Sequence, residues 1–177
     1  MNGTWYTLPA MALVAVPAAY AVEYMSIDAS QRAAFPAGTV FVPVPVDLDA
    51  ATRAKVSAIA NPLGARDPRV WRATAEGKTL GMFYADVVIG KQDYIDYAVA
   101  IDAEGRVTRL DVLAYRESHG SEIRNQRWRA QFIGKTASDP VDVNQDISNI
   151  SGATLSSRHV TDGVRRLLAF NALLAKQ

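Results

Sequence analysis

The chain has 177 residues, which is long enough for one domain with a sizeable core and too short for two ordinary domains. Its 19 basic and 18 acidic residues give a formal net charge of +1, so the charge balance gives no support for nucleic-acid binding. The chain has no cysteine, which excludes disulfides, cysteine-bound zinc, iron–sulfur clusters and thioether-linked haem. If the protein carries out redox chemistry, we therefore expect an organic cofactor.

The N-terminal segment is apolar and carries no charged residue up to Val22. It ends in Ala19-Tyr20-Ala21, which resembles a signal-peptidase site. We predict a signal peptide over residues 1–21, followed by a single domain over residues 22–177. No Lys or Arg precedes the apolar run, and its prolines suit a membrane-spanning helix poorly. A retained N-terminal anchor and a buried N-terminal segment are the alternatives.

The first predicted elements are two short helices and an edge strand. A helix begins after Ser26, whose side chain can cap it, and ends before Pro36. Thr39–Val46 alternates aliphatic residues with prolines, which is typical of the edge of a sheet. A second helix is predicted over Asp49–Ala60, with aspartates at its start that can cap it.

Four strands follow, at Val70–Ala75, Thr79–Val88, Tyr94–Ile101 and Val107–Tyr115. The first two flank Glu76-Gly77-Lys78, which is typical of a hairpin turn. Short turns throughout predict an antiparallel meander.

One face of this sheet needs a cover, which the last part of the chain provides. A helix is predicted from Ser157 onward, with apolar residues at helical spacing, namely Val160, Val164, Leu167, Leu168 and Leu174. The predicted fold class is α+β, a twisted antiparallel sheet covered by helices, with a long C-terminal helix.

The segment before that helix combines small residues, a glycine and several hydroxyl groups: Ser151, Gly152, Ala153, Thr154, Ser156 and Ser157. Glycine lets the backbone approach a ligand closely, and the hydroxyls can hydrogen-bond to it. The helix N-terminus adds free N–H groups and a positive dipole end. These features predict a phosphate site. A helix cap rich in Ser and Thr, without a ligand, would explain the same residues.

Ser-Gly-Ala-Thr at 151–154, before an amphipathic helix, resembles the flavinylation motif of the FMN-binding domain family. A second stretch resembles the same family: Glu117 and Gly120 after the last strand, then Trp128, then Gln-Phe-Ile-Gly-Lys at 131–135. The resemblance covers about Tyr24 to Phe170. The family includes FMN-bearing subunits of the sodium-pumping NADH:quinone reductase and of the Rnf complex, and stand-alone envelope proteins.

The resemblance implies FMN as the cofactor, joined by a phosphoester to Thr154 by a dedicated flavin transferase. It also implies an electron carrier in the periplasm or on the outer face of the cytoplasmic membrane, with a redox donor and acceptor that are membrane proteins. The chain lacks Gly-x-Gly-x-x-Gly, so electrons are expected from a protein partner rather than a nicotinamide.

The motif usually begins with Asp, where this chain has Ser148, and Asp146 is a candidate substitute. A module that binds FMN or another phosphorylated ligand reversibly, as a sensor or assembly factor, is therefore an alternative. A small FMN-dependent reductase is a third possibility.

Four residues of the second stretch are further candidates for cofactor binding. We expect Glu117, His119 and Gly120 near the flavin, because polar groups in a loop after a strand often face a ligand. Glu117 either tunes the isoalloxazine or pairs with one of the neighbouring arginines at 116, 124 and 129. Trp128 lies either against the flavin or in the core.

Overall fold

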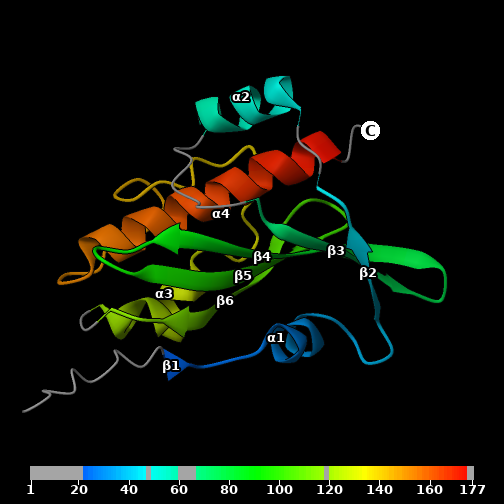
Figure 1. Cartoon of the computed structure of the whole chain (residues 1–177), viewed down its shortest axis with the longest axis horizontal. Coiled ribbons are helices and arrows are strands. Elements are labelled where there is room, and N and C mark those ends of the chain that lie inside the picture. Colours follow the sequence, from blue (N-terminus) through cyan, green and yellow to red (C-terminus); the bar gives the residue numbers. More distant parts are fainter. Residues whose placement is uncertain (1–21, 47–48, 60–66, 118–119, 175–177) are drawn as a thin grey trace, which may run out of the picture.

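The computed structural model describes residues 22–46, 49–59, 67–117 and 120–174. The predicted signal segment 1–21 and the candidate residue His119 lie outside the described residues. At the centre is a six-stranded antiparallel sheet in the order β1-β6-β5-β4-β3-β2 (Figure 1). The strands are β1 (Val22–Glu23), β2 (Val40–Val44), β3 (Arg69–Ala75), β4 (Lys78–Ile89), β5 (Tyr94–Asp102) and β6 (Val107–Tyr115).

The helices are α1 (Ile27–Ala34), α2 (Ala50–Ile59), the 3-10 helix η1 (Ser121–Arg124), α3 (Gln126–Ala130) and α4 (Thr154–Leu174). In Figure 1, α4 lies along one side of the sheet and α1 lies on the other. The predicted α+β class with a long C-terminal helix is therefore confirmed.

Local sequence signals account for most of these boundaries. Ser26 caps α1 by accepting a hydrogen bond from the Ala29 amide, and Asp49 accepts one from the Thr52 amide at the start of α2. Glu76 and Gly77 both adopt positive φ, 50° and 75°, which the two-residue hairpin turn between β3 and β4 requires. The predicted caps and hairpin are confirmed.

The two faces of the sheet carry separate cores because successive side chains in a strand point to opposite sides. On the α4 side, Tyr84 and Val99 pack with the apolar face of the helix. On the α1 side, Phe83 and Ala98 pack with Ile27. The predicted cover is confirmed, and α1 provides a second one.

One predicted boundary is wrong, and one strand was not predicted. Helix α4 begins at Thr154 rather than at Ser157, and the Ser157 amide already donates to the Ala153 carbonyl at 2.9 Å. Hydroxyl residues usually favour caps over helix interiors, but Ser156 and Ser157 are buried here and have hydrogen-bond partners. The strand β1 was not predicted, because two residues are too few to show a periodic pattern.

A buried charged group joins α4 to the sheet. Arg166 of α4 forms an ion pair with Asp86 of β4, and the Tyr97 phenol of β5 donates to the same carboxylate at 2.6 Å. All three side chains are buried. Burial, together with the Asp86 charge, raises the pKa of Tyr97 well above its ordinary value, so the phenol is a neutral donor. Gly163 leaves room for this ring, because a Cβ there would stand 2.3 Å from the Tyr97 oxygen.

We expect Asp86→Ala to destabilise the fold by about 3–5 kcal/mol, because it leaves the Arg166 charge buried without its partner. Tyr97→Phe removes one neutral donor and should cost about 1–3 kcal/mol. Urea unfolding followed by circular dichroism measures both free energies. Equal losses in the two variants would contradict the charge-based explanation.

Candidate functional site

A cleft of about 510 Å³ lies between the turn after β4 and the first turn of α4. Its volume falls in the range of small-molecule sites. Three parts of the chain line it: the β4–β5 turn, Glu117 after β6, and the segment from Gly152 to Ser156. The lining residues are Lys91, Gln92, Glu117, Gly152, Ala153, Thr154, Leu155 and Ser156. The structure therefore brings Glu117 and most of the 151–154 motif together.

The sheet register explains this meeting. Ile95, near the start of β5, pairs with Tyr115, the last residue of β6. The turn before β5 and the residues after β6 therefore lie at the same end of these two strands. His159, in the second turn of α4, has its Nδ1 atom 2.6 Å from the Ile89 carbonyl at the end of β4. This contact brings the start of α4 beside the same turn.

Glu117 holds the turn in place through its carboxylate. Its Oε1 atom accepts hydrogen bonds from the amides of Gln92 and Asp93, at 2.6 and 3.0 Å. Gly90 permits this approach, because a Cβ at that position would stand 2.5 Å from Oε1. Glu117 thus lines the cleft and also orders the turn beside it.

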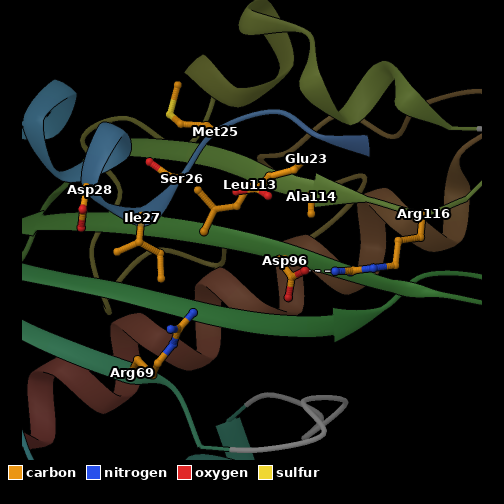
Figure 2. A pocket seen from close by; sticks show the side chains of 10 residues that line it. All are labelled: Glu23, Met25, Ser26, Ile27, Asp28, Arg69, Asp96, Leu113, Ala114 and Arg116. Atoms are coloured by element: carbon orange, nitrogen blue, oxygen red, sulfur yellow. Dashed lines mark ion pairs between the residues drawn. The ribbon is translucent and has the colours of Figure 1, made fainter. Parts of the chain in front are cut away.

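The expected alternative, a pairing of Glu117 with a neighbouring arginine, does not match these contacts. Arg116 pairs with Asp96 at 2.7 Å, in a second hollow on the α1 side of the sheet, which Figure 2 shows. Arg129 pairs with Asp111 at 2.7 Å. Arg116 and Glu117 are consecutive, yet they line hollows on opposite sides of the sheet.

The hydrogen bonds of Glu117 also set its protonation. Burial by itself raises the pKa of this carboxyl, but hydrogen bonds from the amides of Asp93, Gln92 and Lys91 outweigh burial and hold it below its ordinary value. Glu117 is therefore an anion at neutral pH, with its charge directed at backbone N–H groups.

The hydroxyl residues at the start of α4 differ in their exposure. Thr154 is exposed at the cleft as the first residue of α4, whereas Ser156 is buried with its Oγ 3.2 Å from the Tyr115 phenol oxygen. Gly152 has a φ of +83° and lines the cleft, as does the buried Ala153. Ser151 is exposed and is not among the residues that line the cleft.

Gly120 lets the two predicted motifs touch. Its φ is +92°, and a Cβ there would stand 2.5 Å from the Tyr115 phenol oxygen and 3.0 Å from the Ala153 Cβ. Any larger residue would push the segment after β6 away from the segment before α4.

Trp128 occupies the second of its two expected places, the core. Only 6% of it is exposed, it packs on Phe132, and it does not line the cleft. Its indole Nε1 donates to the Ser148 carbonyl at 2.8 Å, and Gln131 Oε1 accepts from the Ser148 amide at 2.8 Å. The aromatic and Gln-Phe positions of the second motif therefore anchor the loop that leads into the first.

Asp146 does not take the place of the missing aspartate. Its carboxylate pairs with Lys135 at 2.8 Å and accepts from the amides of Val141 and Asp142, at 3.2 and 2.9 Å. The residue that reaches Thr154 is Asn149, whose Nδ2 lies 3.4 Å from the threonine Oγ1. The sequence interpretation missed Asn149.

Residues 90–169 match the family model of the FMN-binding domain. The predicted resemblance to this family is confirmed. The matched segment begins at the β4–β5 turn and ends in α4, so it contains every part of the cleft. It leaves out residues 22–89, which the sequence-based resemblance had included from about Tyr24.

Two curated relatives are both named as the G subunit of an ion-translocating oxidoreductase complex. The protein from Stutzerimonas stutzeri is 30% identical over 114 residues, which are 58% of this chain and 50% of the relative. The protein from Aliivibrio fischeri is 30% identical over 92 residues, 46% of this chain and 44% of the relative. The chain thus spans about half the length of these relatives. Within the described residues, no helix has the length and apolar character needed to cross a membrane.

Lys91, Gln92 and Leu155 line the cleft without having been predicted. The meander pattern contained a usable signal for the first two. In an antiparallel meander, the turn before one strand lies beside the end of the next strand. The meander pattern therefore predicts that the turn at 90–92 lies next to Glu117.

The lowered pKa of Glu117 predicts a pH-dependent contribution to stability. A depressed folded pKa stabilises the protein above the unfolded value and loses this effect as pH falls through the folded value. The free energy of unfolding should therefore decrease more from about pH 7 to about pH 3 in the wild type than in Glu117→Gln. Urea titrations at several pH values measure this difference. Parallel pH profiles would contradict the amide-bound carboxylate.

Proposed function

We propose that this chain is an extracytoplasmic electron carrier whose FMN is attached by a phosphoester to Thr154. The observation that carries the proposal is the position of the Thr154 hydroxyl. It is exposed at the start of α4 and at the cleft, opposite the turn that Glu117 orders. The FMN-binding domain match over residues 90–169 supplies the identity of the cofactor.

The chain's own groups suit a flavin phosphate at this position. The first helical hydrogen bond of α4 runs from the Ser157 amide to the Ala153 carbonyl, so the amides of residues 154–156 precede the helical ladder, and the helix dipole adds positive potential there. An anion at Thr154 is therefore stabilised without a dedicated arginine. Gly152 has a positive φ, and the space beside it is open, because a Cβ there would meet nothing within 4 Å.

The remaining walls suit the ring system of the cofactor. Leu155 is 43% exposed and offers an apolar surface beside the attachment point. Lys91 supplies a cation and Gln92 an amide from the ordered turn. When bound, FMN accepts two electrons and releases them one at a time. A positive side chain near the ring favours the reduced, more negative form.

The proposed partners and location follow from the relatives and the N-terminal sequence. The two relatives are subunits of ion-translocating oxidoreductase complexes by name. The predicted signal peptide over residues 1–21 favours export. We propose membrane-bound redox proteins as donor and acceptor, and a flavin transferase as the enzyme that installs FMN.

Intact-protein mass spectrometry tests the attachment. The chain co-expressed with a flavin transferase should exceed its polypeptide mass by one FMN less water and remain yellow after denaturation. Thr154→Val, which keeps the shape and lacks the hydroxyl, should lose the increment completely, whereas Thr154→Ser should keep it. Wild-type chain with dialysable FMN and no increment would favour the reversible binding module instead.

Lys91→Gln should lower the midpoint reduction potential of the bound flavin, because it removes a positive charge from the cleft wall. The shift should shrink at high salt, since exposed charges are screened. Lys78→Gln is the matched control, because Lys78 is an exposed lysine in the β3–β4 hairpin and does not line the cleft. Spectroelectrochemical titration measures the potentials. Equal shifts for both lysines would show a bulk charge effect rather than a local one.

A further inference from the structure

We infer that Asn149 is a positioning residue for flavin attachment, which holds the Thr154 hydroxyl in the orientation that forms the phosphoester. The inference rests on the proposed attachment at Thr154. Its starting point is the long hydrogen bond of 3.4 Å from Asn149 Nδ2 to Thr154 Oγ1. Hydrogen bonds of this kind are often long before the reacting complex forms and tighten within it.

The orientation of the Asn149 amide is determined by two donors on its other side. Its Oδ1 atom accepts from the Ile150 amide at 2.9 Å and from the Ser157 hydroxyl at 2.8 Å. A flipped amide would place its NH₂ group against both donors, which is unfavourable. The amide therefore presents Nδ2, and only Nδ2, to Thr154.

The backbone that carries Asn149 is held just as firmly. The preceding residue, Ser148, has its carbonyl bound by Trp128 and its amide bound by Gln131. On the helix side, Ser157 is fully buried in the first turns of α4. Asn149 thus connects the core around α3 to the helix that begins with Thr154.

Orientation matters because a helical threonine has two accessible χ1 rotamers, in which its hydroxyl points in different directions. A donor on one lone pair of Oγ1 favours one rotamer and leaves the other lone pair available for attack. Positioning of a reacting atom in this way lowers the entropic part of the barrier.

The step that benefits is a phosphoryl transfer with no change in oxidation state. Thr154 Oγ1 attacks the FMN phosphorus of a flavin dinucleotide supplied with the transferase. The Oγ1–P bond forms, the P–O bond to the nucleoside monophosphate breaks, and that monophosphate leaves. The hydroxyl proton goes to a base of the transferase.

An amide suits this position better electrostatically than a carboxylate would. The incoming phosphate is an anion, and a carboxylate next to it would repel it. The neutral Asn149 orients the hydroxyl without adding negative charge. The nearby carboxylate of Asp146 is already bound by Lys135 and two amides.

The test uses the full chain in its flavin-free form, a purified flavin transferase and flavin dinucleotide, with intact mass recorded over time. Chain concentration is varied to separate kcat from KM. Asn149→Ala should lower kcat about tenfold or more, with KM nearly unchanged. The lost hydrogen bonds to Ile150 and Ser157 should lower Tm by only a few degrees. Asn149→Asp keeps an acceptor for Ile150 and Ser157 and offers an oxygen to the Thr154 hydroxyl, so it should recover kcat to within about threefold of wild type. Its negative charge repels the phosphate in the ground state and the transition state alike, so this repulsion should appear as a higher KM.

Gln145→Ala is the matched control. It removes an exposed amide from the same loop, one that bonds to Asp142 and not to Thr154, and should leave kcat unchanged. An unchanged kcat in Asn149→Ala, a loss confined to KM or Tm, or an Asp variant as slow as the Ala variant would each overturn the inference. Failure of the wild type itself to gain FMN would instead contradict the attachment at Thr154.

Discussion

The ion pair between Arg166 and Asp86 determines where α4 lies along the sheet, and the position of the proposed attachment residue depends on it. Thr154 is twelve residues before Arg166 in the same helix, so the two are about 18 Å apart along its axis. The buried ion pair therefore determines the position of the start of α4 relative to the β4–β5 turn. His159, bound to the Ile89 carbonyl, provides a second point of attachment near that end. A helix held at two points along its length cannot slide without exposing buried polar groups, which is costly.

The loop before α4 is positioned by a different set of contacts, which come from the second motif. Trp128 and Gln131 bind the backbone of Ser148, and Gly120 allows the segment after β6 to approach Ala153. These contacts give a physical reason for the two motifs to occur together. An aromatic residue and a glutamine that touch no ligand still shape the ligand site, because they determine where the loop containing Asn149 enters the helix. Changes at either position would act on the cleft from a distance.

The sequence predicted the parts of this molecule that depend on local chemistry. The cap at Ser26, the Glu76-Gly77 turn and the antiparallel order of β4, β5 and β6 each follow from a few neighbouring residues, and all are confirmed. The Ser-Gly-Ala-Thr segment was also identified as a site before α4. What the sequence could not show were contacts between residues distant along the chain. Glu117 was expected near the flavin or an arginine, but its amide partners lie 24 and 25 residues earlier, across the sheet edge. The sequence allowed Trp128 to lie against the flavin or in the core, and only its packing on Phe132 decides between the two.

The charges around the cleft follow one electrostatic logic. Glu117 is an anion at the cleft wall, yet its charge is directed at the amides of Gln92 and Asp93 rather than at the cleft interior. Lys91, on the same turn, supplies a positive charge, and the start of α4 supplies positive potential opposite it. At Thr154 the polar neighbour is the neutral Asn149. A phosphate and a reduced flavin are both negative. Lys91 and the start of α4 would therefore attract either of them. The same carboxylate that orders the turn would repel such a ligand if its amide partners were lost. The hydrogen bonds of Glu117 therefore matter for charge as well as for shape.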